Sequence, residues 1–209
     1  GTGPHPKGKT MTKPLEFWFE FASTYSYPAA MQVEAACAAR GVPLVWKPFL
    51  LGPVFGAQGM TDSPFNMYPV KGAYMWRDME RICAAAALPL QKPSTFPRGS
   101  MLAARICAAH AGADWIGDFV RAVYTVNFAE DLDIGAAEVI GPVLQALGQD
   151  PAAIIDSAGT PEAKQALRAL TDDAIARGIF GAPSFTVGDE LFWGHDRLDM
   201  ALTEAAALA

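Results

Sequence analysis

The sequence predicts an α/β fold in which a large all-helical insertion interrupts a small sheet. A strand–helix–strand pattern occupies 15–49, segments of helical composition fill 62–178, and a hairpin followed by a helix ends the chain. This order of elements is that of a thioredoxin-like fold carrying a helical insertion. Because 51% of the 209 residues are hydrophobic, the chain can bury a core of the size that such a fold needs.

The first strand, the first helix and the second strand follow one another closely. Residues 15–21 alternate between two faces, with leucine and phenylalanine at the odd positions, which predicts a strand. A helix is expected at 28–40, ended by Gly41, and a second strand at 42–49. Such short connections predict a parallel pair of strands with a right-handed crossover.

The middle of the chain predicts helices and no strand. Glycine or proline separates stretches that are rich in Ala, Leu, Arg and acidic residues. Helices are expected at 72–87, 98–112, 114–128, 135–147, 150–157 and 160–178. The last of them begins at Thr160-Pro161, a typical N-cap followed by proline at the first helical position.

The sheet is completed near the C-terminus. Apolar runs at 183–187 and 191–193 flank a Gly-Asp turn, which predicts a hairpin. A final helix is expected at 196–209, with Asp196 as its N-cap. We therefore assign 14–61 and 179–209 to a thioredoxin-like domain, 62–178 to a helical insertion domain, and 1–13 to a disordered leader or cloning remnant.

Composition and charge exclude several classes of protein. The net charge is −6, and no cluster of Lys and Arg interleaves with aromatic residues, so nucleic acid is not expected as a partner. No apolar run of about 18 residues occurs, so no membrane span is expected. The apolar stretch from Leu15 is broken by Glu16 and Glu20 and does not form a secretory signal.

The cysteines and histidines exclude further chemistry. Cys37, Cys83 and Cys107 lie far apart in helical stretches, and no CxxC pair exists, so thiol–disulfide exchange is not expected. Isolated cysteines predict buried free thiols in a reducing compartment, which points to the cytoplasm. The histidines are scattered and give no spacing for a metal site.

Ser23 stands where the first strand gives way to the first helix. A helix N-terminus carries unpaired N–H groups and a partial positive charge, so it stabilises an anion. A serine hydroxyl there can donate a hydrogen bond to the thiolate of another molecule and favour its ionised form. Alternatively, Ser23 caps the helix, which is the commonest use of serine at this position.

Three other segments carry candidate side chains. If the Ala182–Pro183 bond is cis, the backbone groups of Ala182 can pair with a peptide-like ligand; if it is trans, the proline only starts a strand. Asp196 can accept a hydrogen bond from an ammonium group or only cap the last helix. Lys71 and its neighbours in 64–81 form either one wall of a site or an exposed, ion-paired helix surface.

Taken together, four segments point to one family. They are FWFEFASTYSY, PFNMYPVKGAYMWRD, GAPSF and FWGHDRL, in that order along the chain. The chain resembles the 2-hydroxychromene-2-carboxylate isomerase family, which is allied to kappa-class glutathione transferases and to DsbA-like thioredoxin folds. The resemblance extends over 15–209, nearly the whole chain.

The resemblance implies a glutathione site and assigns residues to it. Ser23 matches the active-site serine of the family. The expected glutathione contacts are Ala182, Pro183, Trp193, Gly194, His195 and Asp196. The expected substrate contacts are Phe55, Asn66 and Lys71. At Gly56 the chain lacks the lysine with which the naphthalene-pathway isomerases contact the substrate carboxylate, so the identity of the substrate stays open.

The function that the resemblance implies is that of a cytoplasmic, glutathione-dependent isomerase. The thiolate of glutathione would add to an electron-poor alkene, the bond would rotate as a single bond, and elimination would return glutathione. The substrate is expected to be a small hydrophobic or aromatic electrophile, and family analogy implies a homodimer. A kappa-like glutathione transferase and a glutathione-binding module without catalysis are the alternatives.

Overall fold

A four-stranded mixed sheet lies at the centre of the structure, a computed structural model that describes residues 12–207. The strands are β1 (Leu15–Phe19), β2 (Leu44–Pro48), β3 (Ser184–Val187) and β4 (Glu190–Trp193). They lie in the order β2-β1-β3-β4, with β1 and β2 parallel and the other neighbours antiparallel. The predicted parallel pair and the predicted C-terminal hairpin are therefore confirmed.

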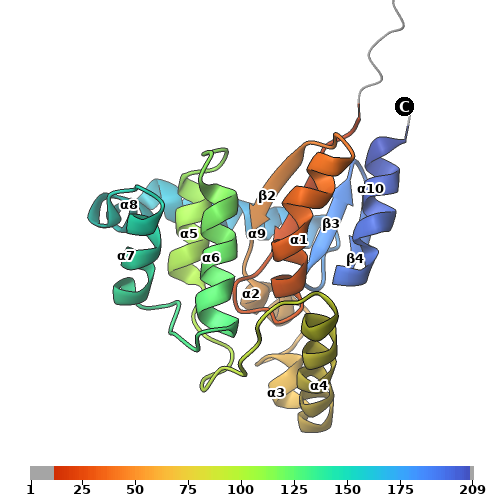
Figure 1. Cartoon of the computed structure of the whole chain (residues 1–209), viewed down its shortest axis with the longest axis horizontal. Coiled ribbons are helices and arrows are strands. Elements are labelled where there is room, and N and C mark those ends of the chain that lie inside the picture. The colour runs from red at the N-terminus through yellow and green to blue at the C-terminus, as the bar shows by residue number, and fades with distance from the viewer. Residues whose placement is uncertain (1–11, 208–209) are drawn as a thin grey trace, which may run out of the picture.

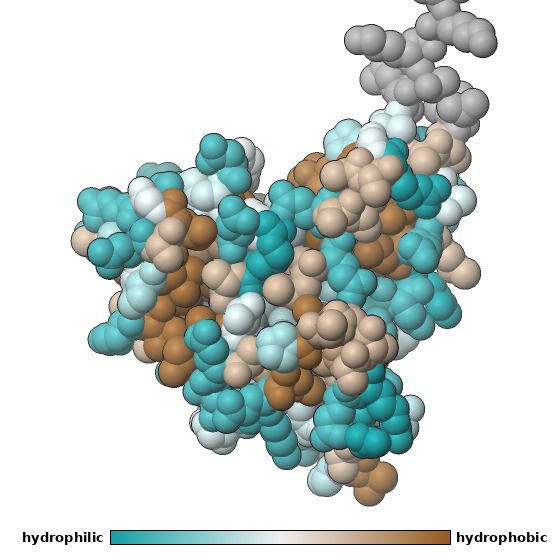
Figure 2. Space-filling view, in the orientation of Figure 1, coloured by the Kyte–Doolittle hydropathy of each residue, from teal (hydrophilic) through white to brown (hydrophobic). Residues whose placement is uncertain are grey.

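Helices cover both faces of the sheet (Figure 1). α1 (Ser26–Ala39) and α10 (Leu198–Ala206) pack on one face, and α9 (Pro161–Ala176) packs on the other. Hydrophilic and hydrophobic residues are mixed on the surface that carries α1 (Figure 2). The leader or cloning remnant expected at 1–13 lies outside the described residues except for its last two positions, and the final helix is described only to 207.

Further helices connect β2 to α9. They are α2 (Leu51–Ala57), α3 (Pro64–Met67), α4 (Pro69–Ala85), α5 (Met101–Ala109), α6 (Ile116–Phe128), α7 (Ala137–Ala146) and α8 (Pro151–Ala158). All the helices that the sequence predicts between 72 and 178 are present, and the described part of this stretch contains no strand. The sequence predicts neither α2 nor α3, because α3 is a single turn and α2 contains two glycines and a proline, which are poor helix formers.

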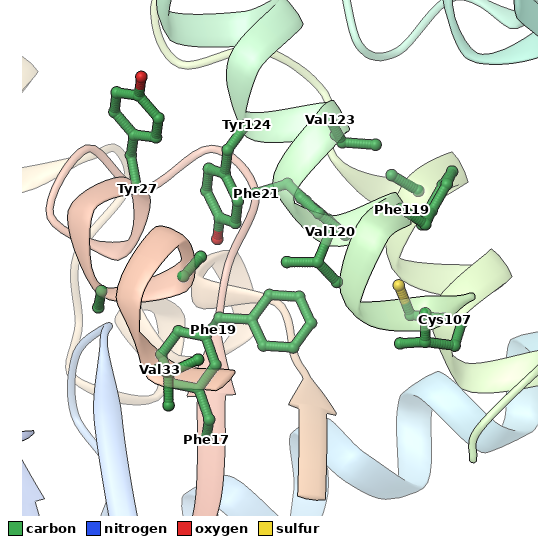
Figure 3. Close-up of a cluster of buried hydrophobic side chains, with 14 of the residues drawn as sticks. Phe17, Phe19, Phe21, Tyr27, Val33, Cys107, Phe119, Val120, Val123 and Tyr124 are labelled. Atoms are coloured by element: carbon green, nitrogen blue, oxygen red, sulfur yellow. The ribbon is translucent and has the colours of Figure 1, made fainter. Parts of the chain in front are cut away.

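β1 divides the buried side chains into two clusters. Phe17 and Phe19, with Phe21 just after the strand, point to the face covered by α1 and α6, where the rings of Phe19 and Phe21 pack near Tyr124 (Figure 3). Trp18 points to the opposite face and packs with residues of α2 and α9. The alternation predicted for 15–21 is confirmed, although both faces are buried and strand pairing ends at Phe19.

The larger cluster of buried side chains runs from the sheet into the helical segment. It joins Phe17 and Val33 to Cys107 of α5, Val120 of α6 and Leu144 of α7. The helices of 62–178 thus share a core with the sheet. Their assignment to a separate insertion domain stays a prediction.

The first and the last helix of the chain begin at other residues than the sequence predicts. α1 begins at Ser26 rather than 28, because Pro28 falls in the first turn, where its missing N–H is not needed. Asp196 does not cap the last helix: it lies inside a short 3-10 turn, His195–Arg197, and Arg197 occupies the N-cap position of α10 without a side-chain bond. The carboxylate of Asp196 therefore does not cap a helix.

The cysteines are buried and unpaired, as the sequence predicts. Burial raises the pKa of the Cys37 and Cys83 thiols to about 11, so neither is a reactive thiolate at neutral pH. Among residues 12–207, no helix combines the length and the apolar character that a membrane span needs.

Candidate active site

A cavity of about 910 Å³ opens where β1 ends and the chain turns toward α1. Its walls come from that turn, from α2 and the segment 58–65 after it, from α4, and from the segments 96–100, 180–183 and 193–197. This volume lies in the range of small-molecule sites, about 300–1,000 Å³. The fold thus gathers segments from both ends of the chain and from the helical middle around one space.

Ser23 lies in a tight turn on the wall of this cavity. Its N–H donates to the carbonyl of Glu20 at 3.0 Å, and its hydroxyl donates to the carbonyl of Ala182 at 3.3 Å. The N-cap position of α1 belongs to Tyr25, so the alternative that Ser23 caps this helix is wrong. Its hydroxyl is half-buried and faces the residue before Pro183.

The two predicted C-terminal segments lie together on the same wall. The Ala182–Pro183 bond is cis, and the carbonyl of Pro183 accepts from the N–H of Gly194 at 3.0 Å. Gly194 has a φ of 111°, and a Cβ there would approach a carboxylate oxygen of Asp196 to 2.6 Å. A side chain at Gly194 would therefore push Asp196 out of place.

The ring of Trp193 is 55% exposed and packs on Phe180, with the ring centroids 5.2 Å apart. Both side chains line the cavity. They give the rim of the site an apolar, aromatic edge.

A polar contact that the sequence did not predict joins α4 to the start of α1. The hydroxyl of Tyr25 donates to the carboxylate of Asp78 at 2.8 Å, and its ring stacks on His195 at 5.6 Å with the planes 6° apart. Burial and the Asp78 charge raise the pKa of Tyr25, so the phenol stays protonated. All three side chains line the cavity, and no local pattern indicates that they meet.

Two of the three residues expected to contact the substrate line the cavity, and the third does not. Phe55 and Lys71 line the cavity, and the ammonium of Lys71 lies 5.9 Å from the centroid of the Phe65 ring. Asn66 is not among the lining residues. Its amide donates to Asp62 and to the carbonyl of Phe96, at 3.5 and 3.4 Å.

Two buried residues with ionisable side chains line the cavity, and the sequence does not predict either of them as part of the site. Glu20 is only 5% exposed, and burial raises the pKa of its carboxyl. Arg98 is also buried, and its guanidinium is held by Asp131 and by the side chain and carbonyl of Asn127. The pattern in 15–21 places Glu20 on the face opposite the phenylalanines but does not show that this face is covered.

No group of three or more His, Cys, Asp or Glu side chains that could hold a metal ion occurs among residues 12–207. The polar groups that the cavity offers are hydroxyls, backbone groups, carboxylates and a few cations. These groups suit an organic ligand that carries amide and carboxylate groups.

The chain is similar to known proteins over most of its length. A family model described as "DSBA-like thioredoxin domain" matches residues 14–205. The 2-hydroxychromene-2-carboxylate isomerase of Sphingobium xenophagum is 30% identical over 190 residues, which is 90% of this chain and 96% of the relative. Glutathione S-transferase kappa 2 of Caenorhabditis elegans is 26% identical, over 89% of this chain and 88% of the relative.

A solved structure of a 2-hydroxychromene-2-carboxylate isomerase shares the fold with a TM-score of 0.80 at 26% identity, over 90% of this chain and 92% of that chain. The chain belongs to the DsbA-like thioredoxin family and, within it, to the family of the 2-hydroxychromene-2-carboxylate isomerases. The fold class and the family that the sequence predicts are thus confirmed.

Proposed function

We propose that this protein is a glutathione-dependent isomerase whose active site is the cavity beside Ser23. The observation that carries the proposal is the meeting of three distant segments. The Ser23 hydroxyl donates to the Ala182 carbonyl at 3.3 Å, and the Gly194 N–H donates to the Pro183 carbonyl at 3.0 Å. The names of the relatives, an isomerase of this type and a kappa-class glutathione transferase, agree with it.

The residues of this wall have separate roles in the proposal. Bound glutathione supplies a thiolate that can add to an electrophilic alkene and leave again. Ser23 donates a hydrogen bond to the sulfur, and each unit by which this lowers the thiol pKa corresponds to about 1.4 kcal/mol. The backbone of Ala182, the residue before the cis Pro183, holds the cysteinyl part. The γ-glutamyl end is received by Trp193, Gly194, His195 and Asp196. The carboxylate of Asp196 does not cap α10.

The remaining walls favour an aromatic substrate. Four aromatic side chains of the helical middle and of α2 also line the cavity: Phe55, Phe65, Tyr74 and Phe96. Aromatic rings pack well against flat, apolar molecules. We therefore propose a small hydrophobic or aromatic electrophile as the substrate, with Phe55 and Lys71 as contacts and Asn66 as a support of the wall through Phe96.

Lys71 is expected to favour electrophiles that carry a carboxylate. Among the described lysines and arginines of the cavity it is the one without an acidic partner, because Arg98 pairs with Asp131 and Arg197 with Asp196. Replacing Lys71 by Met should raise KM for 4-chloro-3,5-dinitrobenzoate about fivefold, since an exposed ion pair contributes up to about 1 kcal/mol. Steady-state transfer assays measure this value.

Two controls accompany the Lys71 variant. KM for 1-chloro-2,4-dinitrobenzene, which lacks the carboxylate, should stay the same. Lys71→Arg, which keeps the charge, should retain most of the preference. An equal rise of KM for both electrophiles in Lys71→Met would contradict a role for Lys71 in charge recognition.

Glutathione itself should stabilise the folded protein. A ligand of the native state present at a hundred times its Kd adds about 2.7 kcal/mol, which for a chain of this size raises Tm by roughly 5–10 °C. Thermal unfolding with increasing glutathione measures the shift. Cysteinylglycine, which lacks the γ-glutamyl group, should give a smaller one. No shift with glutathione would sink the proposal.

The alternatives differ in turnover. A thermal shift together with transfer but no isomerisation would favour a kappa-like transferase, and a shift without turnover on any electrophile would favour a binding module.

We further propose a cytoplasmic location, which the buried unpaired cysteines favour, and a homodimer by analogy with the family. Size-exclusion chromatography with light scattering tests the dimer.

A further inference from the structure

Glu20 carries a buried carboxyl group on the wall of the cavity. One carboxylate oxygen accepts from the N–H of Ala22 at 3.2 Å, and the other accepts from the N–H of Leu51 at 2.9 Å. The carbonyl of Glu20 accepts from the N–H of Ser23 at 3.0 Å. The carboxyl group therefore belongs to the same tight turn as the Ser23 hydroxyl.

The charge of this carboxyl is not offset by a nearby cation. In the part of the chain that the structure describes, Glu20 takes part in no ion pair. Arg98 on the same cavity wall is committed to Asp131 and Asn127, and Lys71 is exposed to solvent. The titratable neighbour on α6, Tyr124, donates its hydroxyl to the Glu20 carbonyl at 2.8 Å.

Two effects act on the proton affinity of Glu20. Burial raises the pKa of its carboxyl, while hydrogen bonds from the Ser100 hydroxyl and from the N–H groups of Leu51 and Ala22 favour the ionised form. Burial outweighs the hydrogen bonds, so the affinity of this group for a proton moves toward that of a thiol. A second negative charge placed beside it would move it further in the same direction.

Building on the proposed function, we propose that Glu20 accepts the proton that the thiol of glutathione loses on binding. The S–H bond breaks, an O–H bond forms on the Glu20 carboxylate, and the total charge of the cavity stays the same. Loss of the proton to water would instead leave a thiolate and a carboxylate in one buried site. Two like charges in such a site are strongly unfavourable. Glu20 thus lets Ser23 bind a thiolate without a rise in buried charge.

Proton counting tests the transfer. Calorimetric titration with glutathione in two buffers of different ionisation enthalpy gives the number of protons released, and the near-ultraviolet absorbance of the bound thiolate shows that the thiol has ionised. At neutral pH the wild-type protein should release close to zero protons while the thiolate absorbance appears. Glu20→Gln, which cannot take up the proton, should release about one proton per site.

Matched controls separate Glu20 from other causes. Glu16→Gln makes the same change at a carboxylate of β1 that pairs with Lys47 and Arg177 outside the cavity, and it should behave as the wild type. S-methylglutathione has no thiol proton and should release none from any variant.

Each result decides between the proposals. Release of about one proton by the wild-type protein, or zero release without thiolate absorbance, would overturn the role of Glu20 while leaving glutathione binding intact. The proton release of the wild-type protein tests the role of Glu20 by itself, even if the Glu20→Gln variant fails to fold. Absence of any binding heat with glutathione would overturn the proposed function itself, and this inference with it.

Discussion

In the Ser23→Ala variant, turnover is expected to fall about 10²-fold, because removal of one hydrogen-bond donor to an anion in an active site lowers kcat by roughly 10²–10³. The thiolate absorbance of bound glutathione should fall with it, since the sulfur regains its proton. The free energy of unfolding should change by only about 1 kcal/mol, because the lost hydrogen bond, to the Ala182 carbonyl at 3.3 Å, is long and half-buried.

A second serine serves as the control for Ser23→Ala. Ser157 lies outside the cavity, with its hydroxyl 2.8 Å from a ring nitrogen of His110. Ser157→Ala should leave turnover unchanged. Ser23→Thr keeps a hydroxyl and should restore part of the thiolate absorbance. If Ser23→Ala keeps wild-type turnover and wild-type absorbance, Ser23 does not act on the sulfur.

The largest loss of stability is expected from Phe19→Ala. Phe19 is fully buried, and its ring centroid lies 5.2 to 5.8 Å from those of Phe17, Phe21 and Trp46. Truncating a buried phenylalanine lowers the free energy of unfolding by about 3–5 kcal/mol, because it removes apolar burial and leaves a cavity. Tm should fall by roughly 6–20 °C. Urea denaturation followed by circular dichroism measures the loss.

Val70 gives the matched comparison for Phe19. Its side chain is 86% exposed at the start of α4, so Val70→Ala should change stability by less than about 0.5 kcal/mol. A loss below about 1 kcal/mol in Phe19→Ala would show that the sheet core tolerates the missing ring and would contradict the central place given to it.

The sequence predicts those parts of the site that lie in short segments with a recognisable local pattern. Ser23 in the β1–α1 turn, Pro183 before β3 and the Trp193–Asp196 turn each carry a local pattern, and the structure brings them to one cavity wall. No local pattern indicates that Tyr25 contacts Asp78 or that Arg98 pairs with Asp131. These partners lie 53 and 33 positions apart, and only the tertiary structure brings them together.

Local patterns also misplace residues when a distant contact decides their environment. Asp196 has the sequence of a helix cap, yet the turn that follows Gly194 is 3-10 and α10 starts two residues later. Glu20 fits the polar face of a strand, yet the first residue of α2 lies against it, and the N–H of Leu51 donates to the carboxylate. A sequence pattern indicates which face a residue occupies but not what lies on it.

The sequence by itself determined that a serine hydroxyl, at Ser23, stands where a thiol nucleophile would otherwise be placed. It also contains no CxxC pair, which dithiol chemistry of the thioredoxin type needs. The order of strands and helices determined the thioredoxin-like fold, because hydrophobic periodicity and turn residues act over a few positions. Only the tertiary structure decided that Ser23 faces Ala182 and not its own helix, and that a buried carboxyl lies in the same turn. Both depend on long-range packing, which sets burial and therefore the proton affinity of Glu20.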